Sequence, residues 1–453
     1  MTGQRDLAAV ILAAGKGTRM KSDVHKVLHP IAGRPMLDHL FAMLDTLSPK
    51  RKLVVVGSGR EQVAELVDSR GGELVVQDHQ LGTAHAVRQA EGKLGDFSGD
   101  VLILFGDTPL VEAETMTRML DRLNAPDRPA VVVVGFRPAD PAQYGRILAR
   151  PDGIIEKMVE YKDATEEERN VDLCNSGLMA ARAADLFPLL ARVGNANAAG
   201  EYYLPDIVMI AASDGRVSAV IETDPWETAG VNSRAELARL EAEWQRRRRL
   251  RAMADGVTLI APETVWFAHD TEIGRDSVIE PNVVFGPGVR IGERVMVKAF
   301  SHIEGAVVSD DAQIGPYARL RPGAEIGEKA RVGNFVEIKK ARLGAGAKAN
   351  HLTYLGDSDI GANANIGAGT ITCNYDGYFK YRTIIGEGAF IGSNSALVAP
   401  VSIGAGALIA AGSVIVRDVA ADSIALARGD QVEKPGRAKR FRETMAARKA
   451  KAD

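Results

Sequence analysis

Short polar segments that could bind a nucleotide follow three apolar runs in the N-terminal half: Leu7–Leu12, Leu74–Val76 and Val101–Phe105. The run Leu7–Leu12 leads into the glycine-rich sequence AAGKGTRM, and the run VLILF leads into Gly106 and Asp107. A glycine turn at the end of a strand exposes backbone N–H groups to phosphate oxygens. A carboxylate at such an end can hold Mg²⁺, which keeps most of its ligands as water and phosphate oxygens. The polar stretch QDHQLGT, residues 77–83, suits either base recognition or a simple loop.

The glycine turn matches neither of the best-known nucleotide motifs. Met20 stands where G-x-G-x-x-G requires its third glycine, and no G-K-[ST] sequence occurs. Arg19 and Lys26 could add positive charge beside the phosphates. The alternative for the glycine segment is a tight strand-to-helix turn with basic residues on the surface. The alternative for Asp107 is a helix-capping aspartate, since Thr108 and Pro109 follow it.

A second group of polar residues interrupts a regular aliphatic pattern in the C-terminal half. The group consists of His351, Tyr354, Lys339 and Arg321. Imidazole accepts a proton near neutral pH, because its ordinary pKa is about 6.5. An exposed histidine without a chemical role is the alternative, and we favour it for His269 and His302.

The aliphatic pattern itself predicts the fold of this half. An aliphatic residue, often followed by glycine, returns every six positions in the runs Ile273–Ile303, Ile314–Ile338 and Ile385–Ile415. A five-residue step leads from Ile338 to Leu343, and the rhythm breaks between Thr372 and Ile385. A hexapeptide period indicates a parallel β-helix, because each unit is a short strand plus a corner and three units close one triangular coil. The β-helix should run from about Val257 to about Arg428. The segment CNYDGYFKYRT, residues 373–383, is too long for one corner and should protrude as a loop.

The first half alternates apolar runs with helical stretches, which predicts an α/β domain with a mainly parallel sheet. Ligands in such sheets lie beyond the carboxyl ends of the strands, where the polar segments fall. A single helix, Asn232–Met253, should follow this domain. The end of the chain, from Glu433, is charged and should be a frayed helix or a disordered tail. The expected strands are Leu7–Leu12, Leu53–Gly57, Val101–Phe105 and Val131–Gly135, and the expected helices include Pro35–Leu47 and Arg60–Ser69.

Composition narrows the class of protein. The chain has 453 residues, of which 46% are hydrophobic and 25% charged, as in a soluble globular protein. Its net charge of −3 is not that of a polyanion-binding protein, and the two cysteines, Cys174 and Cys373, suit a reducing cytoplasm. No apolar run is long enough for a membrane span. Four arginines, Arg246–Arg249, together with the basic tail could bind nucleic acid, but a solvated helix face or contacts between subunits explain them more simply.

The motifs of both halves occur together in one known family. The series LAAGKGTRM, KVLHP, QLGTAHA, FGDTPL, YGRI, VEYKDAT, NSGL, EYYLPDI and VN resembles a sugar-nucleotide pyrophosphorylase. Joined to the hexapeptide repeats, it resembles the bacterial bifunctional N-acetylglucosamine-1-phosphate uridyltransferase/glucosamine-1-phosphate acetyltransferases, from Leu7 to about Arg428. The resemblance implies an α/β Rossmann-like nucleotidyltransferase domain joined by a long helix to a left-handed parallel β-helix.

For the N-terminal domain, the resemblance implies uridylyl transfer from UTP to N-acetylglucosamine-1-phosphate. Asp107 and Asn232 match the family's Mg²⁺ ligands. Phe105 replaces the family's tyrosine, and Ser176 stands where we expect threonine. The positions that match contacts to the uridine nucleotide or the acetylated sugar are Leu12, Ala13, Ala14, Gly15, Lys26, Gln77, Gly82, Thr83, Phe105, Gly106, Asp107, Gly145, Glu160, Asn175 and Asn232.

For the C-terminal domain, the resemblance implies acetyl transfer from acetyl-CoA to glucosamine-1-phosphate, with His351 as the general base. Glu337 could orient this base, and Asn350 stands where glycine is common. The positions that match glucosamine-1-phosphate contacts are Arg321, Lys339, Tyr354 and Asn365. The positions that match acetyl-CoA contacts are Ala368, Asn374, Tyr375, Ser393, Ala411 and Arg428.

The resemblance also implies a homotrimer through the β-helix and a cytoplasmic enzyme whose product feeds cell-wall and lipopolysaccharide synthesis. The expected organisation is residues 1–229 for uridylyl transfer, 230–252 for the helix, 253–430 for acetyl transfer and 431–453 for the basic tail. Two alternatives remain: a nucleotidyltransferase whose β-helix is only a scaffold, and a regulatory subunit without activity. The presence of His351, Lys339, Arg321 and the CNYDG loop argues against the first. Intact Lys26, Asp107 and Asn232 argue against the second.

Overall fold

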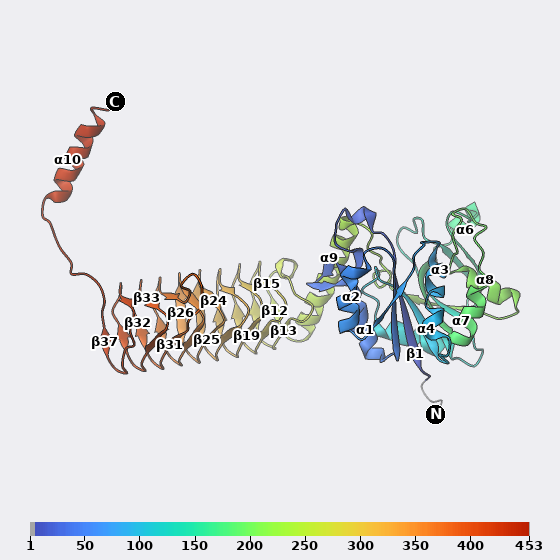
Figure 1. Ribbon diagram of the computed structural model, residues 1–453, viewed down its shortest axis with the longest axis horizontal. Helices are drawn as coiled ribbons and strands as arrows, with labels where there is room; N and C mark the ends of the chain where they lie inside the picture. The colour runs from blue at the N-terminus through green and yellow to red at the C-terminus, as the bar shows by residue number, and fades with distance from the viewer. Residues whose placement is uncertain (1–4, 453) are drawn as a thin grey trace. The chain divides into compact units, whose positions relative to one another are not determined.

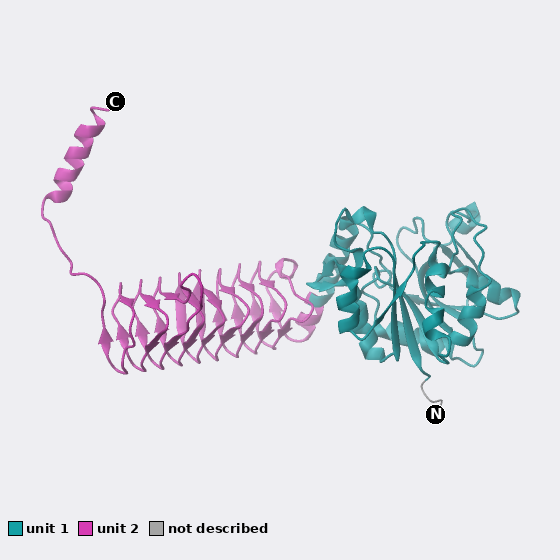
Figure 2. Ribbon diagram, in the orientation of Figure 1, with its two compact units in different colours: residues 1–248 teal, residues 249–453 magenta. Residues whose placement is uncertain are grey.

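The computed structural model describes residues 5–452, which divide into two compact units, residues 1–248 and 249–453 (Figure 2). Unit 1 is a twisted sheet with helices on both faces (Figure 1). Its strands are β1 Leu7–Ala13, β2 Pro30–Ile31, β3 Arg34–Pro35, β4 Arg51–Val56, β5 Glu73–Val76, β6 Asp100–Phe105, β7 Val131–Phe136, β8 Arg146–Ala149, β9 Ile155–Val159, β10 Cys174–Arg182 and β11 Ala219–Thr223. Its helices are α1 Met36–Leu47, α2 Arg60–Ser69, α3 Thr83–Arg88, α4 Glu91–Leu94, α5 Ala113–Leu123, α6 Glu166–Arg169, α7 Ala183–Leu190 and α8 Asp206–Ser213.

The sheet of unit 1 has the strand order β11-β7-β10-β6-β1-β4-β5. All of these strands run parallel except β10, which is antiparallel to β6 and β7. Its central strands are apolar on both faces, since α3, α4, α7 and α8 cover one face and α1, α2 and α5 cover the other. The carboxyl ends of β1, β4 and β6 therefore meet at one edge. Helix α9, Arg234–Ala254, spans the residue at which the two units divide.

Unit 2 consists of successive triangular coils whose strands form, within the described residues, three parallel sheets (Figure 1). The first sheet contains β12 Thr258–Leu259, β14 Val278–Ile279, β17 Met296–Val297, β20 Gln313–Ile314, β23 Arg331–Asn334, β26 Lys348–His351, β29 Asn365–Ile366, β32 Phe390–Ile391, β35 Leu408–Ile409 and β37 Ile424–Ala425. The second contains β13 Glu272–Ile273, β16 Arg290–Ile291, β19 Ala306–Val308, β22 Ala324–Ile326, β25 Ala341–Leu343, β28 Ser358–Ile360, β31 Thr383–Ile385 and β34 Val401–Ile403. The third contains β15 Val284–Phe285, β18 His302–Ile303, β21 Arg319–Leu320, β24 Glu337–Lys339, β27 Tyr354–Gly356, β30 Ile371–Cys373, β33 Ala396–Val398 and β36 Val414–Ile415.

The hexad residues stack inside this coil, as predicted. Leu320, Ile338 and Leu355 are paired in register on successive coils and are fully buried. Burial of each such side chain contributes about 1.5–3 kcal/mol, so the repeated column holds the coils together. The segment between β30 and β31 leaves the coil as the predicted loop, and Tyr378 within it is 87% exposed. The tail forms an exposed helix, α10 Arg437–Lys449, with no buried residue.

Candidate functional sites

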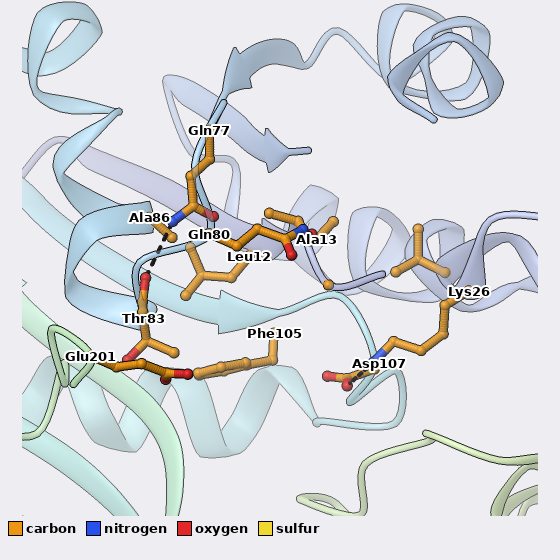
Figure 3. A pocket seen from close by; sticks show the side chains of 14 residues that line it. Leu12, Ala13, Lys26, Gln77, Gln80, Thr83, Ala86, Phe105, Asp107 and Glu201 are labelled. Atoms are coloured by element: carbon orange, nitrogen blue, oxygen red, sulfur yellow. Dashed lines mark hydrogen bonds and ion pairs between the residues drawn. The ribbon is translucent and has the colours of Figure 1, made fainter. Parts of the chain in front are cut away.

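The glycine turn after β1 borders a cavity of about 250 Å³ in unit 1. Figure 3 shows Lys26 and Asp107 at one end of this cavity and Thr83 and Glu201 at the other. The lining residues are Leu12, Ala13, Ala14, Gly15, Lys26, Val27, Gln77, Gln80, Gly82, Thr83, Ala86, Phe105, Asp107 and Glu201. The cavity thus lies beyond the carboxyl ends of β1 and β6, where parallel sheets bind ligands.

Lys26, Asp107 and Asn232 converge at one end of the cavity. The Lys26 Nζ donates to Asp107 Oδ2 at 2.5 Å and to Asn232 Oδ1 at 3.1 Å. The pair is sheltered from solvent, since the two charged side chains are 11% and 19% exposed. Two hydrogen bonds place Asn232 here: Val231 N–H donates to Asp107 O at 2.9 Å, and Asn232 N–H donates to Glu236 Oε2 at 2.7 Å. Two side-chain oxygens from distant segments are therefore aimed at one cation.

The turn formed by residues 77–83 closes another side of the cavity. Gln77 Nε2 donates to Gly82 O at 3.2 Å, and Gln80 Nε2 donates to Ala14 O, which ties this turn to the glycine turn after β1. Gly82 has φ +116°, and a Cβ placed there would lie 2.5 Å from Tyr202 O. Only glycine fits this close approach. The backbone that borders the cavity is consequently held by contacts from three segments of the chain.

The residues predicted to contact the acetylated sugar lie together outside the residues that line the cavity. A Cβ on Gly145 would lie 3.4 Å from both carboxyl oxygens of Glu160, and Gly145 O accepts from Asn175 N–H at 2.9 Å. Burial, reinforced by Asp206, Asp163 and Glu201, raises the pKa of Glu160 above its ordinary value. A carboxyl group in such surroundings is well suited to accept hydrogen bonds from sugar hydroxyls, because it has few protein donors of its own.

The two departures from the family pattern are accommodated locally. The Phe105 ring packs on Gly177, whose backbone has φ +85°, and a Cβ there would lie 2.6 Å from the ring. Ser176 Oγ donates to Val134 O at 2.6 Å and accepts from Leu178 N–H at 3.1 Å. Threonine could form the same two bonds, so the substitution of threonine by serine leaves the backbone contact intact.

In unit 2, His351 lies at the end of β26 with an exposed imidazole. Its Nδ1 is 2.7 Å from Asn334 Oδ1, on the preceding coil. Because an amide oxygen can only accept, Nδ1 is the donor in this contact, and Nε2 is the nitrogen that accepts a proton when the ring is neutral. Glu337, which we expected to orient this base, instead accepts from Arg321 Nη1 at 2.8 Å. That expectation is wrong: an amide on the neighbouring coil orients His351.

Strand register places three predicted acetyl-CoA contacts on one line with His351. Ala349, Ile366, Ile391 and Ile409 are paired in succession from coil to coil. Two positions beyond each of them lie His351, Ala368, Ser393 and Ala411. One backbone contact repeats along the line: the carbonyls of His351, Ala368 and Ser393 accept N–H groups from the next coil at 3.3, 2.7 and 2.8 Å. Arg428 Nη1 donates to Ala411 O at 2.7 Å and so joins the same line.

Three residues predicted to bind glucosamine-1-phosphate lie on or directly after strands of the third sheet, which contains β21, β24 and β27. Lys339 follows Ile338 and Arg321 follows Leu320, so the two cations are neighbours on successive coils. The charge of Arg321 is the largest influence that lowers the pKa of Lys339 below its ordinary value. Tyr354 is paired with Glu337 on the same sheet, and its pKa is raised mainly by burial. Two adjacent cations have the charge that suits a dianionic phosphate.

Asn365 and the two loop residues complete the predicted set. Asn365 is paired with Lys348 on β26, three residues before His351. Asn374 Nδ2 donates to Asp357 Oδ2, and Tyr375 Oη donates to Gly377 O at 2.5 Å, so both side chains hold the base of the protruding loop.

Comparison with known proteins assigns both units. Residues 9–173 match the model of the MobA-like NTP transferase domain, and residues 270–305, 305–340 and 382–417 match that of the bacterial transferase hexapeptide (six repeats). The "Bifunctional protein GlmU" of Rhizorhabdus wittichii is 69% identical over 98% of this chain and 99% of its own length. Those of Sphingopyxis alaskensis and Zymomonas mobilis are 65% and 60% identical over 98% of this chain and cover 98% and 99% of their own lengths. This chain belongs to the GlmU family of bifunctional proteins.

The GlmU family membership confirms the predicted fold class and the predicted bifunctional enzyme of UDP-N-acetylglucosamine synthesis. The nucleotidyltransferase domain is the uridyltransferase, and the hexapeptide β-helix is the acetyltransferase. Four cavity residues, Val27, Gln80, Ala86 and Glu201, and the His351 partner Asn334 were not among the predicted site residues. The stretch QDHQLGT already contained Gln80. Asn334 has no signal in the sequence, because its role depends on the register between coils.

Proposed function

We propose that the cavity of unit 1 is where the phosphate oxygen of N-acetylglucosamine-1-phosphate attacks the α-phosphorus of UTP. The observation that carries this assignment is the convergence of Asp107 Oδ2 and Asn232 Oδ1 on the Lys26 ammonium. With UTP bound, Lys26 would contact phosphate oxygens, and the backbone of Leu12–Gly15 would offer N–H groups to the same chain of phosphates. Gly145, Glu160 and Asn175 would hold the acetylated sugar so that its phosphate meets the α-phosphorus in line with departing pyrophosphate.

The side chains of Asp107 and Asn232 suit Mg²⁺. Mg²⁺ takes one or two protein oxygens and completes its shell with water and phosphate, so a carboxylate and an amide oxygen are sufficient. Residues 5–452 contain no group of three or more His, Cys, Asp or Glu side chains that could hold a metal ion. When bound, Mg²⁺ would neutralise phosphate charge and help to orient the two substrates.

In unit 2, His351 is the proposed general base for acetyl transfer. Nε2 takes a proton from the 2-amine of glucosamine-1-phosphate while the amine nitrogen attacks the thioester carbonyl of acetyl-CoA. The C–N bond forms, the C–S bond breaks, and the proton held by Nε2 passes to the departing sulfur, so coenzyme A leaves as the thiol. Arg321 and Lys339, with Tyr354 and Asn365, would bind the sugar phosphate. Acetyl-CoA would contact Ala368, Ser393 and Ala411 along the line described above, together with Arg428, Asn374 and Tyr375.

Ser393, Ala411 and Arg428 are exposed on one chain, so we propose that a homotrimer through the β-helix completes the acetyl-CoA site. Light scattering should give three chain masses. We further propose that residues 1–229, 230–252, 253–430 and 431–453 act as uridylyltransferase, connecting helix, acetyltransferase and tail, and that the enzyme works in the cytoplasm. Residues 5–452 contain no helix that combines the length and hydrophobicity of a transmembrane span.

The test is an end-point assay with glucosamine-1-phosphate, acetyl-CoA, UTP and Mg²⁺. Wild type should release both free thiol and pyrophosphate. With glucosamine-1-phosphate as substrate, His351→Ala should lose the thiol signal, and it should recover pyrophosphate release when N-acetylglucosamine-1-phosphate is supplied. Asp107→Ala should lose only pyrophosphate. The separate residue assignments would be contradicted if His351→Ala released no pyrophosphate from N-acetylglucosamine-1-phosphate, or if Asp107→Ala released no thiol from glucosamine-1-phosphate and acetyl-CoA.

A further inference from the structure

The two loops that carry Gly145 and Glu160 are fastened by one buried side chain. Gly145 ends the loop between β7 and β8, and Glu160 begins the segment between β9 and β10 that contains α6. Neither loop is part of the central sheet. The antiparallel pairing of β8 with β9, in which Arg146 lies opposite Val159, holds together the ends of the two loops, and the rest of each loop depends on contacts outside this pairing.

Arg146 makes those contacts. It is 2% exposed, and its hydrogen bonds all go to backbone carbonyls. Nη1 donates to Tyr144 O and, at 3.4 Å, to Pro141 O, and Nη2 donates to Ala142 O at 3.1 Å, all in the first loop. Nε donates at 3.2 Å to Arg169 O, in the second. One guanidinium thus bridges both loops next to Gly145.

An aromatic ring supports the bridge. The guanidinium carbon of Arg146 lies 5.5 Å from the ring centroid of Tyr161, and that of Arg169 lies 4.7 Å from it. Arg169 Nε also donates to Tyr161 O at 3.2 Å. Tyr161 directly follows Glu160, so the ring connects the sugar-contacting carboxyl to the bridge.

We propose that Arg146 is a positioning residue that fixes the conformation of the two loops carrying Gly145 and Glu160 and thereby sets the affinity for the sugar phosphate. The inference rests on the uridylyl-transfer site proposed above. The planar fork of arginine reaches carbonyls in several directions at once, whereas the single ammonium of lysine cannot span both loops. Arg146→Lys keeps the charge and removes the bridge. The hydrogen bonds of Arg146 go to backbone carbonyls of loops that do not line the cavity, so the UTP side of the site should be unaffected.

Arg182 offers a matched control. It is 4% exposed and donates to the carbonyls of Leu123, Arg128 and Pro129, as well as to Asp185. It is paired with Asp100, at the opposite end of β6 from the cavity. Arg182→Lys therefore disturbs a comparable buried guanidinium in the same unit without touching the sugar loops.

The experiment measures KM for each substrate of uridylyl transfer, together with Tm, for wild type, Arg146→Lys and Arg182→Lys. In Arg146→Lys, KM for N-acetylglucosamine-1-phosphate should rise about tenfold or more, while KM for UTP changes by less than about twofold. Arg182→Lys should lower Tm and leave both KM values unchanged. The milder variant Tyr161→Leu should raise the sugar-phosphate KM alone by a smaller factor, and it replaces Arg146→Lys if that protein does not fold.

Equal changes in both KM values, an unchanged sugar-phosphate KM, or the same split in Arg182→Lys would overturn the positioning role. If wild type itself releases no pyrophosphate from UTP and N-acetylglucosamine-1-phosphate, the proposed site fails instead. The two failures are therefore distinguishable.

Discussion

Replacement of Asn334 by leucine should weaken acetyl transfer without abolishing it. The bond between His351 Nδ1 and Asn334 Oδ1, at 2.7 Å, fixes the tautomer that leaves Nε2 free. A neutral hydrogen bond contributes about 1 kcal/mol net, and 1.4 kcal/mol corresponds to a factor of ten, so kcat should fall about fivefold. Because the imidazole is exposed, water can replace the lost acceptor, which keeps the effect at this modest size. His351→Ala removes the base itself and should cost about 10²–10⁴ in kcat.

The assay follows thiol release from acetyl-CoA at saturating glucosamine-1-phosphate for wild type, both single variants and the double variant. If Asn334 acts only through His351, the double variant should be no slower than His351→Ala, because the two changes remove one function. Uridylyl transfer from N-acetylglucosamine-1-phosphate serves as the internal control and should stay at the wild-type rate. A double variant with multiplied losses would show that Asn334 acts directly on a substrate and would refute the orienting role.

Three further predictions concern unit 1. Asp107→Asn should retain the fold but lose most pyrophosphate release, measured at several Mg²⁺ concentrations, because an amide is a far weaker Mg²⁺ ligand than a carboxylate. Gly82→Ala should lower both Tm and uridylyl transfer, because its Cβ would meet Tyr202 O at 2.5 Å; unchanged Tm would contradict the close approach. Glu160→Gln should raise Tm at pH 7 but not near pH 4, since the raised pKa of Glu160 means that folding penalises its charged form, and this penalty grows as pH rises from the ordinary to the raised pKa. Thermal unfolding across that range checks the sign.

Most of the fold could be predicted because its physical causes are local. The helices predicted at Pro35–Leu47 and Arg60–Ser69 are α1 and α2, with bounds that agree within one residue. Each has an apolar face with a period of 3.6 residues, which is visible in the sequence. In unit 2 the six-residue period reports the coil directly, since every inward position must be filled. The tail, in contrast, has no buried face, and the sequence left open whether α10 would form.

The candidate sites were less predictable where contacts join distant segments. Lys26 and Asp107 follow recognisable motifs, but the position of Asn232 beside them depends on hydrogen bonds to Asp107 O and Glu236. Arg146 stands within the motif YGRI, yet nothing in that motif shows a guanidinium satisfied by backbone carbonyls of two loops. Such roles depend on tertiary geometry and on which backbone groups remain unpaired, neither of which a local pattern encodes.

The regularity of the β-helix explains how its active site can be built from residues far apart in the sequence. A position on one coil lies beside its counterparts on the coils before and after it, so Asn334, His351, Ala368, Ser393 and Ala411 form one line. The protruding loop leaves between β30 and β31, and the strand pairing continues past it without a shift, so the line is unbroken. Insertion or deletion of one residue within a strand would therefore displace every later member of the line relative to His351. The repeat consequently positions the proposed base against the proposed acetyl-CoA contacts through strand register, in addition to holding the coils together.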